Sequence, residues 1–355
     1  MAVPLCCMNA DSRVKSSRPV AIWLLIGVGM IMIQVLLGGI TRLTGSGLSI
    51  TEWKPLLGTL PPMNDAEWQA AFDQYKTIGQ FKQLNFDFTL QDFKFIFFWE
   101  WLHRNWARLM ALVFAVPFAY FLINRYFVKS MIKPMLLLFL LGGLQGAIGW
   151  IMVKSGLNEE NLYVNHIRLA IHFIAALGLL CYVLWFALKL IIPADQVIVS
   201  RSLKTITTRI IILLVIQLIY GAFMAGLKAG PSAPTWPTIN DQWWPSNITS
   251  DWVSNPINVH FIHRALAYTL TISLIYWWWQ ARKIQGSSLF RFYRSLPMLV
   301  VLLQVILGIF ATLYSPWPAT LLWIGVAHQF TAMLLLILLT IEAFLIRSRS
   351  FQQAR

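Results

Sequence analysis

Charged residues are scarce in this chain, making up 12% of its 355 positions. A soluble domain carries about twice that share, so the composition excludes an ordinary soluble protein. Hydrophobic residues reach 58%, and tryptophan alone occurs 17 times. A long chain with so little charge and so much apolar surface is typical of an integral membrane protein.

Cysteine is also nearly absent. The chain has Cys6 and Cys7 near its start and Cys181 within an apolar run. None lies in a connection expected on the outer side of a membrane, so we expect no structural disulfide. No Gly-x-Gly-x-x-Gly sequence follows a strand, which argues against a nicotinamide or flavin domain. No basic patch is interleaved with exposed aromatic residues, so the net charge of +14 does not indicate nucleic-acid binding.

Long uncharged runs dominate the sequence instead. A helix needs about 20 apolar residues to cross a bilayer, and eight runs satisfy this. Because they are long and do not alternate, they predict helices rather than barrel strands. The runs are residues 20–40, 94–123, 134–153, 166–192, 207–227, 257–279, 296–314 and 320–346.

Lysine and arginine predict the orientation of these spans. Alternate connections are basic, and the others hold most of the acids, so both termini are expected in the cytoplasm. The basic lead before the first run lacks a cleavage signal, which predicts an uncleaved anchor in a bacterial inner membrane. The basic set is Arg13, Lys15, Arg18, Arg125, Lys129, Lys133, Arg201, Lys204, Arg282, Lys283, Arg291, Arg294, Arg347, Arg349 and Arg355.

A repeat organises the runs. Odd-numbered runs contain Gln-x-x-x-Gly, and even-numbered runs contain one histidine at a similar depth. Glutamine and glycine four apart share one helix face, where glycine allows close approach of a neighbouring backbone and glutamine can hydrogen-bond across helices. The pairs are Gln34/Gly38, Gln145/Gly149, Gln217/Gly221 and Gln304/Gly308, and the histidines are His103, His172, His263 and His328.

This alternation predicts an all-α membrane protein of eight transmembrane helices, arranged as two pseudo-symmetric four-helix bundles. The outer connection 41–93 and the tryptophan-rich segment 228–256 are expected to cap the two halves at the membrane surface. The expected units are a tail 1–19, a first half 20–192, a linker 193–206, a second half 207–346 and a tail 347–355.

Ionisable residues deep in a membrane span are costly and usually functional. Paired imidazoles facing each other across a bundle suit axial ligation of haem iron, which predicts the pairs His103/His172 and His263/His328. Zinc is disfavoured, since no cysteine or carboxylate cluster completes a tetrahedral site. A proton relay or simple interhelical hydrogen bonds remain the alternatives.

Four arginines accompany these histidines. Arg104 and Arg264 directly follow two of them, and Arg108 and Arg168 lie within about one turn of the sites. Bidentate arginine suits carboxylates, so we expect these side chains to bind haem propionates. Snorkelling to the interface is the alternative, particularly for Arg168.

The two remaining histidines are predicted not to be ligands. His166 lies at the membrane edge, where an interfacial histidine costs little. His260, three residues before His263, is expected to be solvated or hydrogen-bonded, with assistance to a haem as the alternative.

Glu100 breaks the symmetry between the halves. It lies three residues before His103, where the second half has His260. A carboxylate in a partly dry site can serve as an acid or base, although an ion pair with Arg104 four residues later is the alternative. The asymmetry predicts that the first half performs chemistry and the second holds a cofactor.

Several stretches resemble the haem A synthases. Residues 38–49 read Gly-Gly-x-Thr-Arg-Leu-Thr-x-Ser-Gly-Leu-Ser, followed at 51–55 by Thr-Glu-Trp-Lys-Pro, and residues 97–104 read Phe-Phe-Trp-Glu-Trp-x-His-Arg. Sequences around His172, His263 and His328 fit as well, so the resemblance covers about residues 19–346. The chain lacks the outer-loop cysteine pair of some branches and so resembles the branch without it.

The resemblance implies an oxidoreductase that acts on a CH group. It would convert the methyl group at position 8 of haem O to a formyl group, giving haem A for cytochrome oxidase. By this resemblance His103 and His172 hold the substrate haem, His263 and His328 hold a haem b, and Glu100 assists proton transfer or stabilises a positively charged intermediate. Expected partners are haem O, the enzyme that supplies it, an unidentified electron acceptor and membrane lipid, with a homo-oligomer left open.

Two rival functions fit part of the pattern. A bis-histidine cytochrome b that only transfers electrons would explain the histidine pairs equally well, but it gives no reason for Glu100 or the large connection 41–93. A transporter built from repeats would explain the duplication, but four matched histidines are unusual as a transport lining.

Overall fold

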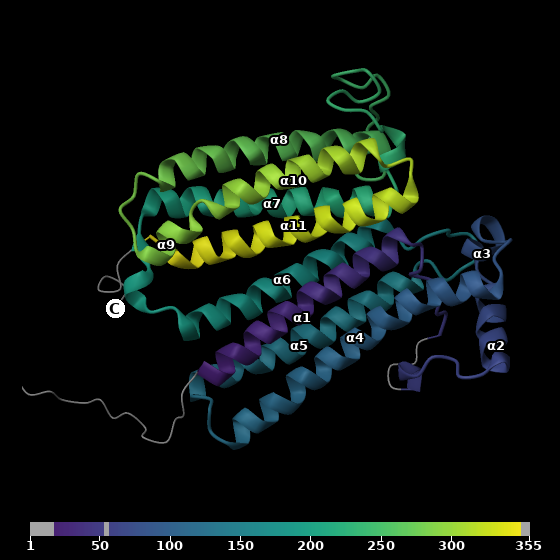
Figure 1. The fold of residues 1–355 in the computed structure, drawn as a ribbon, viewed down its shortest axis with the longest axis horizontal. Helices are drawn as coiled ribbons and strands as arrows, with labels where there is room; N and C mark the ends of the chain where they lie inside the picture. Colours follow the sequence, from purple (N-terminus) through teal and green to yellow (C-terminus); the bar gives the residue numbers. More distant parts are fainter. Residues whose placement is uncertain (1–17, 53–56, 349–355) are drawn as a thin grey trace, which may run out of the picture.

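The computed structural model describes residues 18–52 and 57–348, and this part of the chain is built almost wholly from helices (Figure 1). Cys6, Cys7, Arg13 and Lys15 lie outside the described residues, as do residues 53–55 of the Thr-Glu-Trp-Lys-Pro sequence. The same holds for Arg349 and Arg355 in the second tail.

Every predicted apolar run coincides with a long helix, within a few residues at each end. In the first half these are α1 (Arg18–Leu43), α4 (Leu90–Ile123), α5 (Lys129–Lys154) and α6 (His166–Ile191). In the second half they are α7 (Arg201–Gly226), α8 (Pro256–Ala281), α10 (Leu296–Leu313) and α11 (Pro318–Leu345).

Seven segments of the described chain are long and apolar enough to cross a membrane. They are α1, α4, α5, α6, α7, residues 288–313 and α11. Helix α8 is not among them, because His260, His263 and Arg264 near its start, with tyrosines and tryptophans near its end, lower its hydropathy. The eighth span therefore stays a prediction.

Polar caps define where three of the four histidine-bearing helices begin. Asn165 caps α6 and Asn255 caps α8, each accepting hydrogen bonds from two backbone N–H groups of the first turn. Thr89 and Asp92 form a capping box that starts α4 four residues before the apolar run predicted at 94–123. His103 thus lies further from its helix start than the run suggested.

The added turns of α4 support a small cap at one end of the molecule, made by η1 (Leu57–Thr59), α2 (Asp65–Tyr75) and α3 (Gly79–Leu84) (Figure 1). Phe72 and Tyr75 of α2 pack on Phe93 and Phe97 of α4. Tyr75 donates a hydrogen bond to Gln80, and burial raises its pKa to about 12, so the phenol stays neutral. The expected surface cap over the first half is therefore a folded element.

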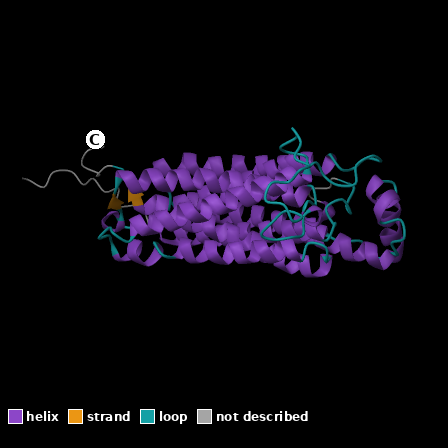
Figure 2. Cartoon of the chain, turned by 90° about the horizontal axis from the view of Figure 1, so that it is seen from above, coloured by secondary structure: helices purple, strands orange, loops and turns teal. Residues whose placement is uncertain are grey.

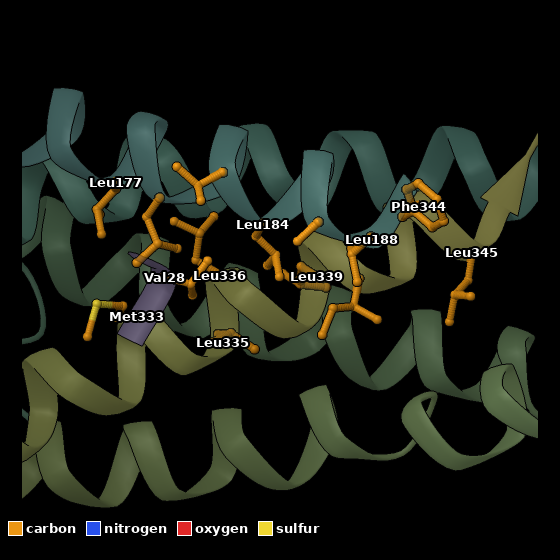
Figure 3. Close-up of a cluster of buried hydrophobic side chains, with 14 of the residues drawn as sticks. Val28, Leu177, Leu184, Leu188, Met333, Leu335, Leu336, Leu339, Phe344 and Leu345 are labelled. Atoms are coloured by element: carbon orange, nitrogen blue, oxygen red, sulfur yellow. The ribbon is translucent and has the colours of Figure 1, made fainter. Parts of the chain in front are cut away.

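The long helices pack in a definite order. α1 contacts α4 and α6, and α5 contacts α6; correspondingly, α7 contacts α8 and α11, and α10 contacts α11. The halves meet along α6, α7, α11 and α1. Leucines such as Leu177, Leu184, Leu336 and Leu339 fill this boundary (Figure 3).

Short elements close the opposite end of the molecule. β1 (Ile198–Val199) follows η2 (Ala194–Gln196) in the linker and pairs in parallel with β2 (Ile346–Arg347) at the end of α11, beside α9 (Ser288–Tyr293). Figure 2 shows this sheet at one end of the helices and the long loops at the other. One of these loops contains η3 (Gly230–Ser232) and the exposed Trp243 and Trp244.

The halves differ along one helix pair. α8 packs against α10, whereas the equivalent helices α4 and α5 have few backbone contacts with each other. Phe139 of α5 reaches Phe114 and Phe118 of α4, with ring centres 4.6 and 4.8 Å apart. Beyond these rings, α5 has Gly142, Gly143 and Gly146, where an added Cβ would meet nothing within 4 Å. We call this side of the first half, between α4 and α5, the α4–α5 seam.

Candidate functional site

Each glycine of the Gln-x-x-x-Gly repeat lies against a histidine of a neighbouring helix. A Cβ on Gly38 would lie 3.3 Å from His103, on Gly149 2.8 Å from His172, on Gly221 3.3 Å from His263, and on Gly308 3.0 Å from His328. The sequence predicted that these glycines admit a neighbouring backbone. They instead make room for the imidazole rings, which explains why the two motifs alternate.

Three of the four glutamines bond to the same histidines. Gln145 Nε2 lies 3.1 Å from His172 Nδ1 and donates to the His172 carbonyl oxygen at 2.9 Å. Gln217 Nε2 lies 3.2 Å from His263 Nδ1, and Gln304 Nε2 lies 3.2 Å from His328 Nε2. The side-chain oxygens of these glutamines and of Gln34 are buried without a hydrogen-bond partner.

The second histidine pair has the spacing that a shared metal ion requires. The ring centres of His263 and His328 are 6.5 Å apart, with the rings inclined by 67°. Metal–imidazole bonds of about 2 Å on each side of an ion would place two ring centres roughly 6 Å apart. His263 and His328 therefore fit the axial positions of a haem iron.

The first pair comes from α4 and α6, and His103 and His172 lie close enough to interact electrostatically. The partnerless glutamine oxygens near the rings also fit haem ligation, since an amide rotated by 180° would present its oxygen to an imidazole N–H. A metal-bound histidine normally donates its second N–H in this way. Among residues 18–52 and 57–348, no three His, Cys, Asp or Glu side chains form a cluster of the kind that holds a metal ion.

Glu100 is 2% exposed, and both of its carboxylate oxygens have hydrogen-bond or ion-pair partners. Its carboxylate accepts hydrogen bonds from Ser49 Oγ at 2.7 Å and from the Ile50 backbone N–H at 2.8 Å. Arg104 lies 2.6 Å away, so the ion pair considered as an alternative is present. The sequence did not reveal Ser49 and Ile50 as partners, although Ser49 ends the Gly-Gly-x-Thr-Arg stretch that carried the resemblance.

Arg104 and Arg264, which directly follow His103 and His263, each hold a connecting loop. Arg104 donates to the Ile50 and Glu52 carbonyl oxygens at 2.9 and 3.1 Å. Arg264 donates to the Ala233 and Thr238 carbonyl oxygens, both at 2.9 Å. The equivalent positions thus fasten a loop in each half.

His260 occupies the place that Glu100 has in the first half. Arg264 Nε donates to His260 Nδ1 at 3.1 Å, just as Arg104 pairs with Glu100. His260 is therefore hydrogen-bonded, one of the two states that the sequence predicted, but it is buried rather than solvated. The negative charge of Glu100 is replaced there by an imidazole.

The sequence matches over this same region. Residues 21–340 match the family described as "Cytochrome oxidase assembly protein". The chain is 38% identical to a haem A synthase of Flavobacterium johnsoniae, covering 92% of this chain and 97% of that protein. It is 41% identical to one of Novosphingobium aromaticivorans and 40% identical to one of Paracoccus denitrificans, covering 95% and 88% of those proteins and 92% and 93% of this chain. The chain belongs to the haem A synthase family.

In this member of the haem A synthase family, the remaining predicted residues lie around the two sites. Arg108 donates to Asn105 Oδ1 at 2.6 Å, one turn beyond Arg104. Arg168 donates to the Ile151 carbonyl oxygen at 3.1 Å and lines a pocket of about 640 Å³ with Lys154. No carboxylate lines this pocket, so its two cations suit an anionic group.

His166 takes no part in either histidine pair of this haem A synthase. Its ring meets Phe223 edge-on at 5.6 Å, and its Nε2 lies 3.5 Å from Ser254 Oγ. It thus lies at the boundary between the halves, near the start of α6.

The glycine contacts give the first test. Gly149→Ala should lower haem A formation roughly tenfold, because its Cβ would displace the His172 ring from the position needed for ligation. Haem A in cells that express the variant is measured by reverse-phase chromatography. Gly178→Ala, in the helix that carries His172, is the matched control, since a Cβ there would meet nothing within 4 Å. Equal haem A yields from the two variants would contradict the role given to Gly149.

Proposed function

We propose that this enzyme oxidises the methyl group at position 8 of haem O to a formyl group, with the substrate held in the first half between His103 and His172. Glu100 carries this proposal. It is a buried carboxylate three residues from His103, and the second half has His260 in the same place. An electron-transfer cytochrome needs no such difference between its halves.

The second half holds a haem b between His263 and His328. The haem irons, when bound, supply the electron-transfer chemistry. Arg264 in the second half, and Arg104, Arg108 and Arg168 in the first, bind propionates at the end of the molecule where Arg104 and Arg264 fasten loops.

The first-half side chains position and stabilise the reacting methyl group. Ser49, Ile50 and Arg104 fix the Glu100 carboxylate by three donated hydrogen bonds. A carboxylate held in this way stabilises positive charge that develops on the neighbouring carbon, or receives a proton from it. With the oxygen atom taken from water, conversion of –CH3 to –CHO releases four electrons and four protons, so a separate electron acceptor is required.

The α4–α5 seam is the route by which substrate reaches the first half. Haem O carries a farnesyl chain and so partitions into lipid. We expect an opening to the lipid there, because α4 and α5 have few backbone contacts and a Cβ on Gly142, Gly143 or Gly146 would meet nothing within 4 Å. On the equivalent side of the second half, α8 and α10 pack together. A resident haem b needs no such opening, because it does not exchange at each turnover.

The architecture that supports this function has eight spans in two pseudo-symmetric four-helix bundles, residues 20–192 and 207–346. Helix α8 is the eighth span, because it matches α7 in length at 26 residues and packs between α7 and α10. Basic connections place both termini on the cytoplasmic side of a bacterial inner membrane. The enzyme that makes haem O supplies the substrate.

Haem extracted from cells tests this function. In a host that makes haem O but no haem A, expression of this chain should produce haem A and deplete haem O, as measured by reverse-phase chromatography. An empty vector is the control. Unchanged haem composition, with extra haem b bound to the protein, would instead support the electron-transfer cytochrome.

A further inference from the structure

The four Gln-x-x-x-Gly repeats share a sequence but not a geometry. In three of them the glutamine amide and the glycine, one turn apart on one helix, both contact the same imidazole ring. The amide contacts a ring nitrogen while the glycine lies against the Cε1 side of the ring. Two contacts from one rigid helix restrict both the position and the rotation of the ring.

The first repeat departs from this arrangement. Gln34 makes no hydrogen bond to His103, and its Oε1 is buried without a partner. Gly38 faces Nε2 of His103 at 3.3 Å, whereas the other three glycines face Cε1 of their histidines. The ring of His103 is therefore turned differently and is not held by an amide.

Helix α1 also contacts the second half of the protein beside Gln34. Gln329 of α11 donates from Nε2 to the Val35 carbonyl oxygen of α1 at 2.8 Å, directly beside Gln34. Its side-chain oxygen lies against Gly39, the residue after Gly38. Helix α1 is thus fixed by α11 at the level of the repeat, and the corresponding helix α7 carries a glutamine that does reach its histidine.

We infer that Gln145, Gln217 and Gln304 are positioning residues that hold His172, His263 and His328 on haem iron, and that His103 is the exchangeable ligand of the first pair. This rests on the proposed assignment of the substrate haem to His103 and His172. Partners that hydrogen-bond a ligand histidine orient it and raise its basicity, and their removal typically weakens metal binding about 10–100-fold. A histidine without such a partner leaves the metal more readily.

Release of His103 from the iron would open a coordination position close to Glu100. Glu100 precedes it by three residues on α4, so both side chains lie on the same face of that helix. A coordination position vacated by His103 therefore opens on the side where Glu100 lies. Both ligands in the second half are held by glutamines, which suits a haem that exchanges electrons without changing its ligands.

Carbon monoxide binding tests the exchangeable ligand, because it requires a free axial position on reduced haem. The purified full-length enzyme, loaded with haem O and haem b and then reduced, should bind carbon monoxide at haem O only. His103→Ala should retain haem O and bind carbon monoxide roughly tenfold faster, whereas His172→Ala should lose haem O. Carbon monoxide binding at haem b alone or at neither haem, or loss of haem O from His103→Ala with retention in His172→Ala, would overturn the inference.

Matched glutamine variants test the positioning role. Gln145→Leu should weaken haem O retention roughly tenfold, while Gln34→Leu, at the equivalent position of α1, should leave it within about twofold. Gln217→Leu should shift the electron paramagnetic resonance g values of haem b, which report the orientation of the axial imidazoles. Equal losses from Gln34→Leu and Gln145→Leu, or unshifted g values in Gln217→Leu, would overturn it.

The same preparations separate this inference from the proposed function. Failure of the wild-type enzyme to bind haem O, with haem b bound normally, would reject the substrate site and with it the role of His103. The Gln217→Leu spectrum would then still decide whether the glutamines position haem ligands.

Discussion

Glu100→Gln is expected to abolish haem A formation, lowering it by at least about a hundredfold, the order of loss when an electrostatic group is removed from a reacting centre. Glutamine has nearly the same size and can still accept the hydrogen bonds from Ser49 and Ile50. It lacks the negative charge that faces Arg104 at 2.6 Å and that would stabilise a positive centre on the substrate. Haem O should accumulate while bound haem b remains unchanged, as measured by chromatography of extracted haems.

Glu342→Gln is the matched control for the loss of a buried carboxyl group. Glu342 lies in α11 with 0% exposure, and both of its oxygens lack a hydrogen-bond partner. Its replacement removes a buried carboxyl group far along α11 from His328, so haem A formation should persist. Haem A production by Glu100→Gln at the wild-type level would refute the role of Glu100.

His263→Ala should reduce bound haem b at least about tenfold, because the remaining His328 supplies one axial ligand where two are needed for a six-coordinate iron. The pyridine haemochrome spectrum of the purified protein measures this loss.

His166→Gln is the control for His263→Ala, since His166 contacts Phe223 and Ser254 and belongs to neither pair. It should retain the wild-type amount of haem b. Unaltered haem b in His263→Ala would show that the second pair does not ligate the iron.

The long helices were predictable because their apolar runs exceed the length needed to cross a membrane, and their ends fall within a few residues of the expected ones. α4 shows the limit of this reasoning. Its capping box at Thr89 and its packing on α2 extend it beyond the apolar run, which hydropathy cannot register. α8 shows a second limit. Its His263 and Arg264 lower the mean hydropathy by which membrane-spanning helices are detected.

The sequence predicted which ionisable residues make up the candidate site, but few of the contacts that they make. Glu100 and the four histidines stood out because ionisable groups are costly inside apolar helices. Ser49 and Ile50 did not, because they reach Glu100 from a loop about fifty positions earlier. The position of each glycine under an imidazole, and the absence of an amide on His103, depend on helix rotation, which a shared spacing leaves undetermined.

The consecutive glycines Gly38 and Gly39 of α1 each contact a different half of the protein. Gly38 lies against His103 of the first site, and Gly39 lies against Gln329, the residue after His328 of the second. Neither half is therefore a separable module, since the first half expressed alone would lose the α11 contact that fixes α1 beside His103. Although the sequence repeats, the two histidine pairs are therefore expected to assemble together as the whole chain folds.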